Sequence, residues 1–98
     1  MSKTFTLHDI PFEWDQVKAE NNWRKHRITF ETACEVFFDP FLRPADPGTE
    51  GGEQRLATVG MTVAWQLLFV VYVERSESVR IISARQATSA ERKSYEDL

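Results

Sequence analysis

The segment at residues 65–74, WQLLFVVYVE, constrains the fold more than any other part of the chain. Residues 67–73 are apolar at successive positions, which predicts a strand whose two faces are both covered by other parts of the protein. The run is far shorter than the roughly 20 residues that cross a membrane. We therefore expect this segment to be the central strand of a sheet.

Neighbouring segments extend this sheet. Residues 55–61 and 78–84 are expected to be strands, and the connections at 62–64 and 75–78 are short enough for hairpins, which predicts a mostly antiparallel meander. Residues 10–14, IPFEW, predict an edge strand, since Pro11 is tolerated only at an edge or a strand start. Residues 42–53 are rich in Pro, Gly and acidic side chains and predict a loop, with a short strand around 41–43.

Three helices are expected. Asp15 is a suitable N-cap for residues 16–25, and Thr29 for a second helix that ends at Asp39-Pro40. Thr88 and Glu91 have the spacing of a capping box and predict a third helix over 89–97. The second helix has the clearest apolar stripe: Phe30, Ala33, Cys34 and Phe37.

These elements indicate an α+β fold. We expect a mostly antiparallel sheet, two N-terminal helices packed on one face, and a short C-terminal helix. A chain of 98 residues has the length of one domain, here 1–98, within which residues 1–9 are expected to be loosely held.

Composition narrows the function. The net charge of −3 argues against coating nucleic acid through bulk charge, although five of the six cations after residue 50 are arginines, which suit forked phosphate contacts. A single cysteine excludes an intrachain disulfide and a thiolate zinc site. The N-terminus does not read as a signal peptide, so the cytoplasm is the expected location. Because no metal-ligand set, phosphate loop or serine-nucleophile motif is present, we expect no cofactor.

The run Trp23-Arg24-Lys25-His26-Arg27 is the first candidate site. A histidine titrates near neutral pH and suits proton transfer, which points to His26, with Lys25 beside it. Cations at a helix C-terminus also complement the helix dipole without any further role. Both interpretations remain open from the residues alone.

The arginines of the C-terminal half form the second candidate group. Arg80 and Arg85 are five residues apart in one strand, so they point to opposite faces unless the strand ends or bulges between them. Arg55, Glu74 and Arg75 stand at strand ends on one edge of the sheet and are more often solvated surface than site. On the last helix, Arg92 and Tyr95 fit either a grip on phosphate and bases or the rim of a protein interface.

Read together, the motifs resemble a known family. The segments FEWDQVKAENNWRKHRITFETACEVFFDP, GEQRLATVG, LLFVVYVER and VRIISARQATSAERKSYE resemble the pattern of BrnT-type toxins, across about residues 12–96. The chain departs from this pattern at two positions. Arg27 stands where the family has glycine after Lys-His, and Met61 stands where it usually has a basic residue.

The resemblance implies a RelE/ParE-like fold and the toxin half of a type II toxin–antitoxin pair. It implies a metal-independent endoribonuclease that blocks translation, with Lys25, His26, Arg55, Arg80 and Arg85 as catalytic residues. Substrate contacts are expected at Glu74, Arg75, Arg92 and Tyr95, and Glu74 is the weaker alternative for the base.

The implied partners are RNA and a BrnA-type ribbon-helix-helix antitoxin, through which operator DNA would be bound, and no membrane. A homodimer or a heterotetramer with antitoxin is possible. The alternative is a binding module or degenerate toxin that docks the same partner without catalysis.

Overall fold

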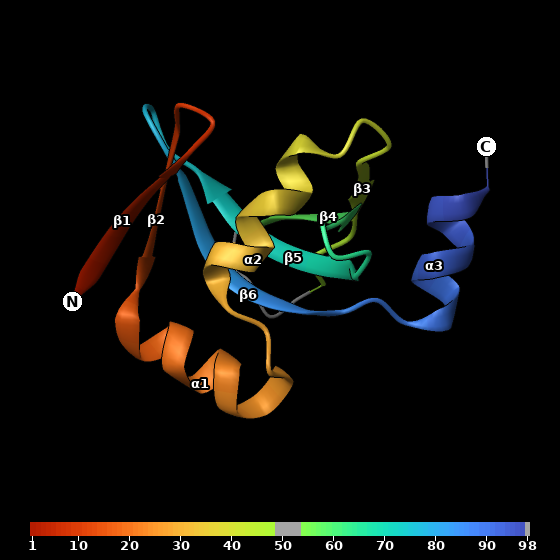
Figure 1. Ribbon diagram of the computed structural model, residues 1–98, viewed down its shortest axis with the longest axis horizontal. Coiled ribbons are helices and arrows are strands. Elements are labelled where there is room, and N and C mark those ends of the chain that lie inside the picture. The colour runs from red at the N-terminus through yellow and green to blue at the C-terminus, as the bar shows by residue number, and fades with distance from the viewer. Residues whose placement is uncertain (49–53, 98) are drawn as a thin grey trace.

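The computed structural model describes residues 1–48 and 54–97. The loop expected at 42–53 therefore lies partly outside the described residues. The described chain folds into a six-stranded sheet with three α-helices (Figure 1), which confirms the α+β class and the mostly antiparallel sheet. No helix in the described ranges is long and apolar enough to span a membrane.

The strands are β1 (Ser2–Leu7), β2 (Ile10–Asp15), β3 (Arg43–Ala45), β4 (Leu56–Met61), β5 (Leu67–Glu74) and β6 (Val79–Gln86). Their order in the sheet is β1-β2-β6-β5-β4-β3, and every neighbouring pair is antiparallel except β2 with β6. The apolar segment around β5 is therefore interior, as its pattern predicts.

The N-terminal part differs from the expectation. The two helices were expected to be N-terminal, with only the strand at 10–14 before them; this is wrong, because the first helix follows a complete β1–β2 hairpin. Residues 2–7, which were expected to be loose, pair along their length with β2. The segment 10–14 lies inside the sheet rather than at its edge, because β1 covers one side and β6 the other. Pro11 is accommodated near the start of β2, opposite Thr6.

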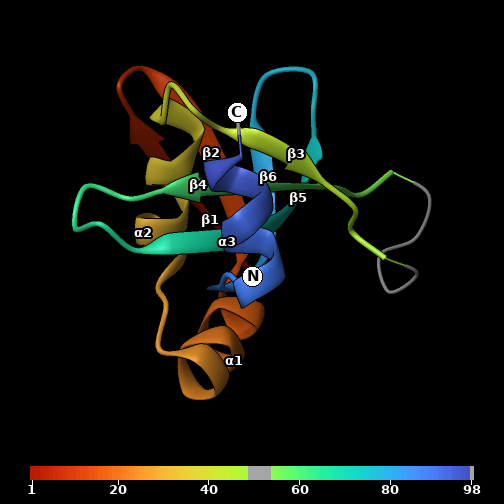
Figure 2. The ribbon, with the colours of Figure 1, turned by 90° about the vertical axis from the view of Figure 1, so that its right-hand side faces the viewer.

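The helices are α1 (Gln16–His26), α2 (Phe30–Cys34) with a 3-10 turn η1 (Glu35–Phe38), and α3 (Ser89–Glu96). α1 and α2 lie on one side of the sheet and α3 on the other (Figures 1 and 2). The first side encloses the main core around Phe12, Trp14, Phe30 and Leu68. Cys34 is fully buried there, and burial raises the pKa of its thiol to about 12, as suits a core residue.

The second side of the sheet is less deeply covered. Its cluster consists of Ala57, Val59, Leu67, Phe69 and Val71, and Tyr95 of α3 packs against it. Although α3 crosses this side of the sheet (Figure 2), it has no buried residue of its own. We call this side of the sheet the α3 face.

Asn22 fixes α1 to the sheet. Its side-chain amide donates to the carbonyls of Ile28 (3.0 Å) and Ala84 (2.9 Å), and its Oδ1 accepts from the Ala84 N–H (3.0 Å). A buried amide with all three bonds formed is stable only in this placement, because each lost bond would leave a desolvated polar group. The C-terminal turn of α1 is thereby held against the middle of β6.

Candidate active site

A cavity of about 410 Å³ lies where the last turn of α1 meets the α3 face of the sheet. Lys25 and His26 reach it from α1, Ser83 and Arg85 from β6, and Glu91 from α3. Phe69 and Val71 form its floor, and residues 46–48 form one rim. Three of the residues predicted to be catalytic, Lys25, His26 and Arg85, therefore meet in one place.

A β-bulge in β6 decides which face its arginines occupy. Val71 pairs with Ser83, but the next residue, Tyr72, pairs with Ile81, so Ile82 is the extra residue of the bulge. Arg85 then stands opposite Phe69, and Arg80 opposite Val73. Because the two partners are four residues apart on β5, both arginines lie on the α3 face, separated by about 13 Å of strand.

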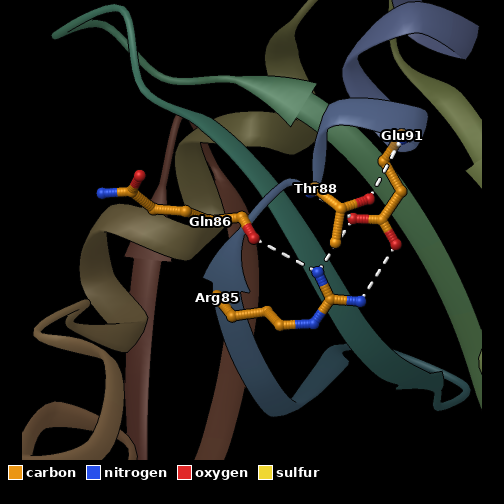
Figure 3. Close-up of polar contacts among 4 residues, drawn as sticks. All are labelled: Arg85, Gln86, Thr88 and Glu91. Atoms are coloured by element: carbon orange, nitrogen blue, oxygen red, sulfur yellow. Dashed lines mark hydrogen bonds and ion pairs between the residues drawn. The ribbon is translucent and has the colours of Figure 1, made fainter.

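Arg85 is held by several contacts (Figure 3). Its Nη1 and Nη2 donate to Glu91 Oε1 (2.8 Å) and Oε2 (2.9 Å), and Nη1 also donates to the Gln86 carbonyl (3.2 Å). The guanidinium carbon lies 4.1 Å from the centre of the Phe69 ring. The hydrogen bonds with Glu91 raise the pKa of Arg85 and lower that of Glu91. Three of the five guanidinium N–H groups are occupied, and two remain for a ligand.

Glu91 joins this pair to the start of α3 (Figure 3). Its Oε1 accepts from the Thr88 N–H (2.9 Å), and its own N–H donates to Thr88 Oγ1 (3.2 Å), which is the capping box predicted from the sequence. The same carboxylate therefore caps α3 and orients Arg85. The sequence indicated the cap but not the ion pair.

His26 lies in a positive environment. Partial burial, followed by the charges of Lys25 and Arg85, lowers the pKa of its imidazole from the ordinary value. Burial and nearby cations both disfavour the imidazolium form. The imidazole is thus kept neutral over a wider pH range and can accept a proton.

Arg80 makes a separate ion pair at the other end of β6. Its Nη1 donates to Glu13 Oε2 (2.9 Å), while Ser78 Oγ donates to Glu13 Oε1 (2.9 Å). The hydrogen bond from Ser78, followed by that from Arg80, lowers the pKa of Glu13. The side chains of both partners are about one-fifth exposed, so the largely buried charge of Arg80 has a carboxylate partner.

The remaining predicted residues lie away from the cavity. Arg55 precedes Leu56, which pairs with Tyr72, so it stands at the Arg80 end of the sheet. Glu74 is exposed and follows the parity of Leu68 and Val70, on the face opposite the arginines. Arg75 is exposed in the turn after β5.

On α3, Arg92 is exposed and lies 3.9 Å from Glu96. Tyr95 packs against the sheet, and its hydroxyl donates to Asp39 Oδ2 (2.5 Å). Burial, with this hydrogen bond, raises the pKa of Tyr95 to about 12. Packing on the sheet, one of two roles considered for Tyr95, is therefore the role it has here.

Sequence reasoning missed Ser83 and Asp46 as lining residues. Ser83 reaches the cavity because it stands two residues before Arg85 in β6 and shares its face, opposite Val71. Asp46 reaches it because β3 brings the following residues across the sheet. Strand parity with Arg85 was the available signal for Ser83, whereas no local signal points to Asp46.

Comparisons with known proteins point to one family. Residues 14–91 match the family model described as "Ribonuclease toxin, BrnT, of type II toxin-antitoxin system". Among solved structures, the crystal structure of the Brucella abortus ribonuclease toxin BrnT is similar, with a TM-score of 0.61 and 22% identity over 78% of this chain and 94% of that one. This likeness shows a shared fold. No curated protein sequence matches the chain significantly.

Proposed function

Because the chain belongs to the BrnT family of ribonuclease toxins of type II toxin–antitoxin systems, we propose that it is an endoribonuclease that inhibits translation and cleaves RNA without a metal ion. The observation that carries this proposal is the cavity in which His26 and Lys25 face the fixed guanidinium of Arg85. The toxin domain extends over residues 1–98, and its sheet and helices are a variant of the RelE/ParE-like fold.

The proposed reaction uses the ribose 2′-hydroxyl as nucleophile. The neutral imidazole of His26 takes the 2′ proton while the 2′ oxygen bonds to the adjacent phosphorus. As the bond from phosphorus to the 5′ oxygen breaks, the Lys25 ammonium gives a proton to that oxygen. The products are a 2′,3′-cyclic phosphate and a 5′-hydroxyl end. One P–O bond forms and one breaks, while one proton goes to His26 and one leaves Lys25.

Arg85 stabilises the additional negative charge on the phosphorus. Glu91 holds the guanidinium in place, so little reorganisation is needed when the charge develops. Removal of one such donor lowers rates by about 10²–10³-fold in comparable sites. Arg80 and Arg55, at the far end of the sheet, contact phosphates further along the RNA rather than the reacting one.

The test is cleavage of single-stranded RNA by the purified protein in excess EDTA. We expect His26→Ala to reduce cleavage at least 100-fold and to restore growth of cells that express the protein alone. His8→Ala is the matched control, because the only other histidine packs edge-to-face against Phe38, outside the cavity. If folded His26→Ala cleaves like the wild type, the proposed site is wrong.

The same assay tests the alternative of a module without catalysis. The ion pair between Arg85 and Glu91 favours this alternative, because a guanidinium whose charge is offset by a carboxylate stabilises a phosphate less. Intact RNA at a large protein excess would support it.

We also propose that the antitoxin of this chain is a BrnA-type ribbon-helix-helix protein, through which the pair binds operator DNA. Co-expression with the protein encoded beside this chain, followed by size-exclusion chromatography with light scattering, tests the partner. The mass distinguishes a heterotetramer from other assemblies. Suppression of RNA cleavage in the complex is the expected functional result.

A further inference from the structure

A second cavity adjoins the candidate active site along α1. It has a volume of about 210 Å³ and is lined by Lys18 and Asn21 of α1, by Ile82 of the bulge, and by Lys25, His26 and Ser83, which it shares with the first cavity. The two cavities therefore adjoin at these three residues. A strand of RNA seated in the first cavity would reach the second by passing over them.

Lys18, Asn21 and Lys25 form one row on the helix surface. They occupy positions i, i+3 and i+7 of α1, which share one face. Lys18 and Lys25 are about 10 Å apart along the axis, which is the length of about three stacked nucleotides at about 3.4 Å each. The row is thus long enough to follow several phosphates.

The position of Lys18 is not explained by the stability of α1. It stands in the first turn, where the helix dipole disfavours a cation, and that turn contains no acidic residue. Among the residues that the structure describes, no carboxylate is within ion-pair distance of Lys18. Its ammonium is available to an external anion although the protein as a whole is acidic.

We propose that this groove is a subsite for the nucleotides next to the scissile phosphate, with Lys18 contacting a phosphate and Asn21 a ribose or base edge. The proposal rests on the proposed ribonuclease function. The shared Lys25 and His26 favour RNA as the occupant, since they connect the groove to the reacting group. An acidic segment of a protein partner is the competing occupant.

Binding of a fluorescein-labelled, 2′-O-methylated RNA 12-mer, followed by anisotropy, tests the subsite without cleavage. We expect Lys18→Ala to weaken binding about 5-fold and to reduce the slope of log K against log salt by about 0.7, the value for one phosphate contact on a single strand. Asn21→Ala should weaken binding about 2-fold without changing this slope.

Arg24→Ala is the matched control. It removes one cation from the same helix, but Arg24 lines a different cavity, beside Glu20 and Glu31. We expect its affinity for the 12-mer to equal that of the wild type. If Arg24→Ala and Lys18→Ala weakened binding of the 12-mer equally, the effect would come from the net charge of the protein, and the subsite proposal would be wrong.

The outcomes separate the two proposals. If the wild type cleaves RNA but Lys18→Ala binds the 12-mer like the wild type, the subsite is wrong and the ribonuclease stands. If the binding pattern holds but no RNA is cleaved, the catalytic proposal fails and the groove stands as an RNA-binding site alone. If Lys18→Ala weakens only the complex with the antitoxin, the groove is a protein interface and the subsite is wrong.

Discussion

Arg27 occupies a left-handed backbone conformation, with φ of 58° and ψ of 32°, at the C-cap of α1. Its N–H donates to the Trp23 carbonyl (2.8 Å), so the conformation closes the helix. Glycine adopts this conformation without steric strain, whereas a side chain adds roughly 1 kcal/mol or more. The guanidinium of Arg27 lies 5.4 Å from the centre of the Trp23 ring, and this cation–π contact stabilises the folded state by about 0.5–1 kcal/mol.

The backbone strain at Arg27 and its contact with Trp23 together predict an order of stability for three variants of this position. Arg27→Gly should unfold at a urea midpoint equal to or above that of the wild type, with a gain of up to about 1 kcal/mol, because it removes strain and stacking together. Arg27→Ala should be the least stable of the three, because it keeps the strain and loses the stacking. An Arg27→Ala variant more stable than the wild type would contradict this account.

His26 gives a prediction for pH dependence. Burial and the charges of Lys25 and Arg85 lower its pKa, so the proposed base is still neutral somewhat below the ordinary pKa of about 6.5. Cleavage should fall on the acid side only as pH drops through this lowered pKa. Lys25→Ala removes one positive neighbour and should raise the pKa of His26, which NMR titration of the imidazole measures without any need for activity. An unchanged or lower pKa in Lys25→Ala would refute the electrostatic cause.

At the level of elements, α3 is attached to the sheet by a few specific contacts rather than by burial. Besides the Arg85–Glu91 pair, Tyr95 bonds Asp39, and Arg43 Nη2 donates to the Asp97 carbonyl (2.6 Å). Burial opposes ionisation of Asp39, but hydrogen bonds from Tyr95, Phe41 and Met61 lower its pKa. With no buried residue of its own, α3 should be the helix that opens most readily.

Glu91→Gln should therefore loosen α3 selectively. The change removes one partner of a partly buried ion pair and weakens the cap, with an expected loss of roughly 1–3 kcal/mol. Amide hydrogen exchange should accelerate in α3 more than in β5. Glu96→Gln is the control, because its pair with Arg92 is exposed and long (3.9 Å), so it should change exchange very little.

The same pair predicts how α3 responds to acid. The folded-state pKa of Glu91 is lowered, chiefly by Arg85, so its contribution to stability is fully present above the ordinary Glu pKa of 4.5. That contribution is lost as pH falls through the lowered pKa. Exchange in α3 should consequently rise at acid pH in the wild type, and this rise should be smaller in Glu91→Gln.

For the molecule as a whole, the sequence predicted local patterns better than long-range connections. The apolar segment 67–73, the capping residues Asp15, Thr29 and Thr88, and the hairpins β4–β5 and β5–β6 were readable, because each depends on neighbours in the chain. The parallel pairing of β2 with β6 was not, since it joins Phe12 to Val79, far away in sequence. β1 was missed because SKTFTL alternates only weakly, and its partner β2 stabilises it.

The same contrast between local patterns and long-range contacts applies to the candidate site. Lys25 and His26 were readable as a titratable run, but their meeting with Arg85 depends on Asn22, which joins α1 to Ala84 of β6, far away in the sequence. The ion pair between Arg85 and Glu91 depends on how the chain turns after β6, and no residue pattern predicts that turn.

The N-terminal strand provides a test at this scale. Met1 is joined to the start of α1, since its carbonyl accepts from the Gln16 N–H (2.9 Å) and its ammonium lies 3.3 Å from Asp15 Oδ1. Phe5 and Leu7 pack against the main core. Deletion of residues 2–7 should expose the β2 edge and lower the urea midpoint substantially. A silent deletion would instead indicate a loose N-terminus, as the sequence suggested.

The bulge at Ile82 also bears on which changes this strand can undergo. Conservative replacements at Ile82 leave the spacing between the two arginines intact. Loss of Ile82 itself would restore regular pairing and keep Arg80 opposite Val73, so both arginines would stay on the α3 face. Loss of Ala84 would instead place Ser83 at a fully buried position of the main core. In a deletion scan of the gene, loss of the Ile82 codon should therefore be tolerated better than loss of the Ala84 codon.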